Sequence, residues 1–170
     1  MPYWSGLPLD TMHPSPNPEF MRKAIALATE NVRSGNGGPF GAVIAKDGVL
    51  IGEGINSVTR DNDPTAHAEV SAIRAACQIL GVFSLRGCEI YTSCEPCPMC
   101  LAAIYWARIN RIWYANTSAD AARIAFDDAF LYRELALPLT ERTVPASILL
   151  REQAWESFQL WLDIPNKTPY

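Results

Sequence analysis

The sequence predicts an α/β fold, a three-layer α/β/α sandwich in which helices cover both faces of a mixed five-stranded sheet. Short apolar runs with the length of strands alternate with longer segments whose apolar residues recur at helical spacing. The first two runs meet at Asp47–Gly48, a dipeptide typical of tight hairpins, so an antiparallel pair precedes the alternating part. This order favours one mixed sheet with helices on both faces. With 170 residues, 49% of them apolar, the chain is expected to form one domain, residues 1–170.

An irregular arm and a helix are predicted at the N-terminal end. Five of the thirteen prolines lie within the first eighteen residues, so residues 1–17 are expected to form an irregular arm. Asn17, Pro18 and Glu19 are typical of a helix N-cap and first turn, and Gly35 is typical of a C-terminal stop. The apolar residues between them share one helical face: Phe20, Met21, Ala24, Ile25, Ala28 and Val32.

The remaining elements follow from the same two patterns. A polar loop is expected before the second helix, which Gly81 ends, and Pro98 opens the third helix. Apolar runs of strand length predict strands at residues 40–45, 49–58, 88–92, 111–115 and 143–150. Helical spacing predicts the further helices at residues 66–80, 98–107, 119–126 and 152–162.

Charge and composition argue against nucleic acid and membrane partners. The net charge is −4, the pI is about 5.2, and no basic cluster is larger than Arg22–Lys23. The longest apolar run, residues 101–107, is far shorter than the roughly 20 residues that span a bilayer. The N-terminus lacks the pattern of a secretory signal, and an odd number of cysteines favours a reducing compartment. We therefore expect a cytoplasmic protein.

Two short motifs have the composition of a metal site. His67-Ala68-Glu69 lies at one predicted helix start, and Pro96-Cys97-Pro98-Met99-Cys100 lies at another. One imidazole and two thiolates suit a tetrahedral zinc ion whose fourth position stays open, whereas a structural zinc site has four protein ligands. At a helix start, Glu69 could reach a zinc-bound water and shuttle its proton. An H-x-E motif followed by P-C-x-x-C is the known signature of the zinc deaminases.

The spacing of the cysteines leaves the choice of ligands open. Cys94, Cys97 and Cys100 are evenly spaced, so two C-x-x-C motifs overlap, and cysteines are also common as inert core residues. Placement at a helix start favours Cys97 and Cys100, which leaves Cys94 as a packed thiol at the strand end. Cys77 and Cys88 are expected in the core.

The two motifs resemble those of the cytidine-deaminase-like superfamily, whose members are α/β/α sandwiches with one zinc ion per subunit. This resemblance covers about residues 19–135. Further segments are similar to the bacterial guanine deaminases, as is the final Tyr170, whereas the long arm before Asn17 departs from that pattern. These segments are residues 37–43, 62–67, 105–108 and 126–128.

The resemblance implies an activity, a cofactor and a set of roles. The activity is hydrolytic deamination of guanine to xanthine and ammonia by a zinc-bound hydroxide, a step of purine catabolism. It also implies a homodimer in which the C-terminal segment, about residues 137–170, is swapped between subunits. The implied roles are zinc binding by His67, Cys97 and Cys100, proton transfer by Glu69, hydrogen bonding of the base by Asn56, walls at Phe40 and Trp106, acceptance from purine N–H groups by Asp128, and closure of the partner's site by Tyr170.

Other interpretations remain open. Each substrate-binding residue has an ordinary alternative, such as a turn residue, a core aromatic, a helix cap or a frayed terminus. A tRNA adenosine deaminase would share the motifs, but the last 34 residues hold three basic and four acidic side chains, a poor surface for phosphates. Another small amino-heterocycle, such as a pterin or aminotriazine, is a further candidate substrate. A non-catalytic zinc module would not need Glu69.

Overall fold

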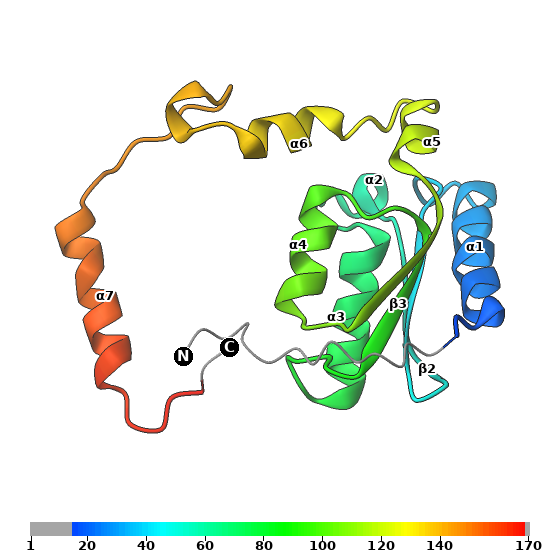
Figure 1. Ribbon diagram of the computed structural model, residues 1–170, viewed down its shortest axis with the longest axis horizontal. Coiled ribbons are helices and arrows are strands. Elements are labelled where there is room, and N and C mark those ends of the chain that lie inside the picture. Colours follow the sequence, from blue (N-terminus) through cyan, green and yellow to red (C-terminus); the bar gives the residue numbers. More distant parts are fainter. Residues whose placement is uncertain (1–14, 169–170) are drawn as a thin grey trace. The chain divides into compact units, whose positions relative to one another are not determined.

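The computed structural model describes residues 15–168, which divide into two compact units on either side of the Asp128–Ala129 bond (Figure 1). The first unit contains the sheet and the helices packed on it, and the second contains helices. Within residues 15–168, no helix combines the length and the apolar character that crossing a membrane requires.

The sheet of the first unit is mixed and has four strands in the order β2-β1-β3-β4. β1 pairs with β2 and with β3 in antiparallel orientation, whereas β3 and β4 are parallel. Asp47 and Gly48 both have positive φ, 50° and 77°, as the predicted tight hairpin requires. The strands are β1 (Gly41–Lys46), β2 (Val49–Ile55), β3 (Cys88–Cys94) and β4 (Arg111–Asn116).

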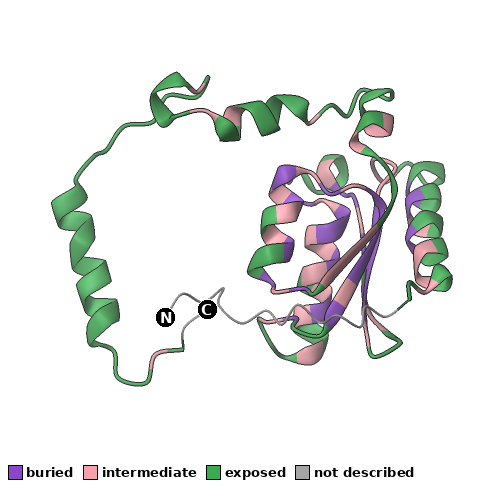
Figure 2. Cartoon of the chain, viewed as in Figure 1, coloured by how far each residue is buried: buried purple, intermediate pink, exposed green. Residues whose placement is uncertain are grey.

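Helices cover both faces of this sheet, as predicted (Figure 1). Ala42 and Ile44 of β1 point to the face that packs on α3 (Ala68–Leu80), while their neighbours Val43 and Ala45 point to the opposite face. That opposite face packs on α1 (Pro18–Arg33). The buried residues of the unit gather between these layers (Figure 2). The alternating pattern of β1 therefore builds two cores from one strand.

The helix ends confirm the predicted start and stop residues. The Asn17 side chain accepts a hydrogen bond from the Glu19 backbone N–H at 2.9 Å, and Gly35 follows α1 with φ 70°. Gly81 ends α3 with φ 65°. Pro98 occupies the first turn of α4 (Pro98–Trp106), where its missing N–H has no intrahelical role.

Close packing of β2 on α3 fixes where α3 begins. A Cβ atom on Gly54 would lie 2.1 Å from the Ala68 carbonyl oxygen, so only glycine permits this approach. The end of β2 is thereby held against the first turn of α3, the turn that follows His67.

The prediction of a fifth strand was wrong, because residues 143–149 form no strand or helix. Pro145 lacks a backbone N–H, and a strand needs a partner, which the second unit does not provide among residues 129–168. Two helices were not predicted: α2 begins at residue 58, the last residue of the predicted second strand, and α6 lies between the predicted elements. The elements outside the sheet layers are α2 (Val58–Asp61), α5 (Ser118–Ala122), α6 (Ala129–Ala136), η1 (Leu139–Glu141) and α7 (Arg151–Asp163).

Candidate metal centre and active site

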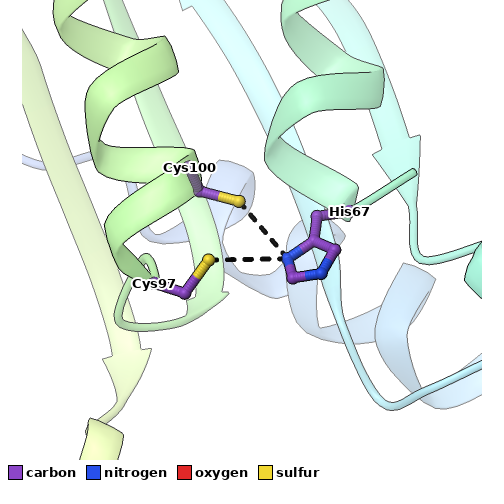
Figure 3. Close-up of side chains that lie close together, drawn as sticks. All are labelled: His67, Cys97 and Cys100. Carbon is purple, nitrogen blue, oxygen red and sulfur yellow. Dashed lines mark hydrogen bonds between the residues drawn. The ribbon is translucent and has the colours of Figure 1, made fainter. Parts of the chain in front are cut away.

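Two helix N-termini bring three metal-binding side chains together. His67 is the extended residue before α3, Cys97 is the extended residue before α4, and Cys100 lies in the first turn of α4. Their side chains point toward one another (Figure 3). The sequence separates His67 from the cysteines by 30 and 33 positions, so the sheet and its two helices create this cluster.

The distances within the cluster fit zinc. His67 Nδ1 lies 3.6 Å from Cys97 Sγ and 3.5 Å from Cys100 Sγ, and the three donor atoms lie within 4.8 Å of one another. Zinc bonds of about 2.3 Å to sulfur and about 2.0 Å to nitrogen, at tetrahedral angles, separate these atoms by about 3.5 Å. Three protein donors leave a fourth position for water or substrate, the arrangement of catalytic rather than structural zinc.

The electrostatics of the cluster give its two thiols very different pKa values. The pKa of Cys97 is lowered to about 4, first by a hydrogen bond from Cys100 and then by His67. The pKa of Cys100 is raised because this thiol keeps its proton to donate that bond and because it is buried. The pKa of His67 is raised by its hydrogen bond to Cys97. A bound metal ion must displace protons, so its affinity falls as the pH falls.

A buried carboxyl group lies next to these donors. Glu69 is only 6% exposed, and its Oε2 lies 3.4 Å from Cys100 Sγ. Burial raises the pKa of this carboxyl group above its ordinary value. A carboxyl group with a raised pKa can both take and give a proton near neutral pH.

The other cysteines lie apart from this chemistry. Cys94 is buried at the end of β3, and its thiol faces the Thr117 carbonyl oxygen at 3.6 Å. Burial raises the pKa of Cys94 to about 11 and also raises the pKa values of Cys77 and Cys88. Within residues 15–168, the donor atoms that converge closely enough to hold a metal ion are those of His67, Cys97 and Cys100, and none of these three other cysteines is among them.

Two predicted base-binding residues lie on the His67 side of the sheet. Asn56 follows β2 and is buried, and the next backbone N–H, of Ser57, donates to the Ala66 carbonyl oxygen at 2.9 Å. The Phe40 carbonyl oxygen accepts the Asn56 backbone N–H at 3.1 Å. Phe40 also packs against the core cluster that includes the first residue of α3. These bonds place both residues beside the start of α3.

The segment before α6 brings an acid and an aromatic ring to the same region. The pKa of Asp128 is raised, first by partial burial and then by the negative charge of Cys97. The Phe126 ring packs edge-on against Phe40, with ring centroids 4.9 Å apart. Sequence reasoning gave Phe126 no role; its position in the motif Phe126-Asp127-Asp128 was the available signal.

Trp106, the other predicted wall, lies away from the cluster. Trp106 is 59% exposed and ends α4, six residues after Cys100, which is about 9 Å further along the helix axis. Tyr170 lies outside the described residues. Their roles stay predictions.

The sequence that forms this cluster matches a known protein family. The family profile described as cytidine and deoxycytidylate deaminase zinc-binding region matches residues 14–116, more than half of the chain. That range contains His67, Glu69, Cys97 and Cys100.

The similarity to one relative extends well beyond that region. Guanine deaminase of Bacillus subtilis is 54% identical over 151 residues, which cover 89% of this chain and 97% of that protein. Its X-ray structure superposes with a TM-score of 0.88, covering 92% of this chain and 99% of that chain at 52% identity. A guanine deaminase structure from Nitrosomonas europaea has a TM-score of 0.63 and 30% identity, covering 69% of this chain and 68% of that one. The tRNA-specific adenosine deaminase of Agrobacterium fabrum is 49% identical over 76 residues, 45% of this chain and 50% of that protein.

Proposed function

The chain belongs to the family of zinc-dependent cytidine and deoxycytidylate deaminases, and from this premise we propose that it hydrolyses guanine to xanthine and ammonia. The observation that carries the choice of substrate is the extent of the similarity to Bacillus subtilis guanine deaminase, which covers 97% of that protein. The similarity to the tRNA-specific adenosine deaminase of Agrobacterium fabrum covers only 45% of this chain. We propose that the whole chain, residues 1–170, forms one functional domain.

The side chains of the cluster supply the proton transfers that this reaction needs. Zinc held by His67, Cys97 and Cys100 would activate water by lowering its pKa. Glu69 takes one proton from the attacking water and gives it to N3 of guanine as the water oxygen bonds to C2. Glu69 then passes the second proton to the amino group, the C2–N bond breaks, and ammonia leaves. Xanthine keeps the proton on N3, so the atoms balance with water as the only co-reactant.

Recognition of the base is assigned to residues around the cluster. Asn56 Oδ1 accepts bonds from the backbone N–H groups of Gly38 and Val58, at 3.3 and 3.4 Å. The Asn56 amino group is thereby free to donate to acceptor atoms of the purine. The half-buried Asp128 carboxylate accepts purine N–H groups, and Phe40, supported by Phe126, forms one wall. In this proposal Trp106 and Tyr170 complete the pocket.

An ammonia-release assay over guanine, adenine, cytosine, their nucleosides and tRNA tests the substrate. We expect release from guanine and only weak tRNA binding at physiological salt, because the net charge of −4 offers few phosphate contacts. Inosine formation in tRNA with guanine inert would replace this function by tRNA editing. Release from a pterin or aminotriazine alone would assign another amino-heterocycle.

The C-terminal segment supports a proposal about the assembly. Among residues 129–168, α6 and α7 contain no buried residue (Figure 2). Large apolar side chains stay exposed there, with Ile148 and Leu149 at 83% and Phe158 at 62%. Such a surface favours burial against another chain. We propose that residues 137–170 are exchanged within a homodimer and that Tyr170 closes the partner's site.

Mixing two inactive variants tests this exchange. One variant lacks residues 166–170, and the other carries Glu69→Gln. In a swapped dimer, a mixed pair combines one intact Glu69 with an intact tail from the other chain, so refolding an equal mixture should restore about a quarter of the sites. Each variant refolded alone is the control. Absence of restoration, a fully active truncation, or a monomer at micromolar concentration contradicts the exchange.

A location is proposed on chemical grounds. All five cysteines lie within the described residues and are free thiols, which agrees with a reducing compartment. We therefore propose a cytoplasmic location, and the proposed substrate, guanine, assigns the reaction to purine catabolism.

A further inference from the structure

Asn31, in the last part of α1, is a polar side chain buried in an otherwise apolar layer. It is 2% exposed, and its Nδ2 donates to two backbone carbonyl oxygens, those of Gly38 and Asn56, both at 2.8 Å. These acceptors lie 7 and 25 positions further along the chain. One amide group therefore joins α1 to the turn before β1 and to the residue after β2.

The bonds of Asn31 complete a closed ring around the predicted base-binding residues. The Gly38 carbonyl oxygen also accepts the Phe40 backbone N–H at 2.8 Å, and the Phe40 carbonyl oxygen accepts the Asn56 backbone N–H at 3.1 Å. Asn56 Oδ1 in turn accepts the Gly38 backbone N–H at 3.3 Å. The ring fixes the backbone of Phe40 and both the backbone and the side-chain amide of Asn56.

The two carbonyl oxygens that face the Asn31 side chain require an NH₂ group there. Both partners of Nδ2 are carbonyl oxygens, which only accept, so the opposite orientation of the Asn31 amide is excluded. Asn31 Oδ1 has no hydrogen-bond partner in the described part of the chain, so its two donated bonds are what the residue contributes. The turn before β1 also passes very close to Asn56. A Cβ on Gly37 would lie 2.2 Å from the Asn56 carbonyl oxygen, so position 37 admits only glycine.

We propose that Asn31 is a positioning residue that holds Phe40 and Asn56 in the geometry needed to bind the purine. This inference rests on the proposed function, because it assigns a role to two residues of the proposed pocket. Asn31 has no hydrogen bond to the metal-binding cluster: within residues 15–168 and outside the bonds of its own helix, its partners are Gly38, Asn56, Ser34 and Asn36. It acts on the reaction through the orientation of the Asn56 amide and the Phe40 ring.

A double-mutant cycle on the zinc-loaded full chain tests the proposal. Asn31→Leu removes both donors at similar size and is expected to lower kcat/KM for guanine by about 100-fold, with zinc content unchanged. Asn31→Ser, which retains a single donor, is the milder variant if Asn31→Leu folds poorly. Asn17→Ala is the matched control, because it removes an N-cap bond from the same helix without touching the ring. It should leave kcat/KM unchanged.

The cycle separates positioning from loss of stability. If Asn31 acts through Asn56, the double variant Asn31→Leu/Asn56→Ala loses much less than the product of the two single losses. Losses that multiply in full would overturn the proposal, because independent effects indicate a structural role alone.

Amide hydrogen exchange measured by NMR gives a second readout that needs no substrate. Asn31→Leu, or Asn31→Ser, should speed exchange at the backbone amides of Gly38, Phe40 and Asn56, whereas Asn17→Ala should not. Unchanged exchange at these amides overturns the positioning role. If the parent protein leaves guanine intact, the proposed function fails while the exchange rates still decide the role of Asn31.

Discussion

Glu69→Gln protein is expected to bind zinc as the parent does and to deaminate guanine about 10²–10⁴-fold more slowly. The substituted amide has nearly the shape of the carboxyl group, so the buried position beside Cys100 can still be filled. An amide cannot accept the proton of water, and the site excludes solvent that could replace it, because the side chain is almost completely buried. Steady-state ammonia release and zinc content by elemental analysis measure the two halves of this expectation.

A matched glutamate provides the control. Glu53 on β2 is exposed and forms an ion pair with Lys23 at 3.0 Å, away from the donors. Glu53→Gln should keep both zinc and turnover. Near-normal turnover in Glu69→Gln would remove Glu69 from the mechanism, and loss of zinc in that variant would make it a metal ligand instead.

Cys100→Ala is expected to abolish stoichiometric zinc binding and to lower stability far more than Cys94→Ala. The energy of metal binding is also folding energy, so removing a ligand removes both. Cys94→Ala deletes a packed thiol that donates to the Thr117 carbonyl oxygen, and a loss of about 1 kcal/mol is typical for such a change. Zinc content and denaturant midpoints measure both variants.

A chelator sharpens the comparison of the two cysteines. It should lower the midpoint of the parent and of Cys94→Ala while leaving that of Cys100→Ala unchanged, because the last has no zinc to lose. Loss of zinc from Cys94→Ala would show that the overlapping motif, Cys94 and Cys97, supplies the ligands.

Local signals in the sequence account for most of the fold and for the metal-binding cluster. Asn17 acts through a side-chain bond to the backbone two residues away, and Gly35 and Gly81 act through their own backbone, so α1 and α3 could be placed without tertiary information. The ligand motifs lie at helix starts, and local sequence signals are sufficient to predict where those helices begin. The predicted strand at residues 143–150 failed for the opposite reason, since a strand depends on a partner that composition does not reveal.

The parts of the site that depend on distant contacts could not be predicted. Phe126 meets Phe40 across 86 positions of sequence, and Asn31 reaches Asn56 across 25. No periodicity or motif marks a buried asparagine that donates to two carbonyl oxygens. Trp106 illustrates the converse, because its apolar pattern allowed a core position whereas it is largely exposed within one chain; the wall role that the resemblance implies stays a prediction.

The separation of the metal donors along the chain has a consequence when zinc is limiting. A metal ion held by His67 and Cys97 closes a loop of about 30 residues, which contains α3 and β3. Unlike a disulfide, this link forms in a reducing compartment, breaks when the chain unfolds, and can be removed by a chelator. Its contribution to the free energy of unfolding therefore rises with the logarithm of the free zinc concentration above the dissociation constant. Zinc supply would then set the fraction of folded protein, and with it the protein's lifetime when zinc is scarce.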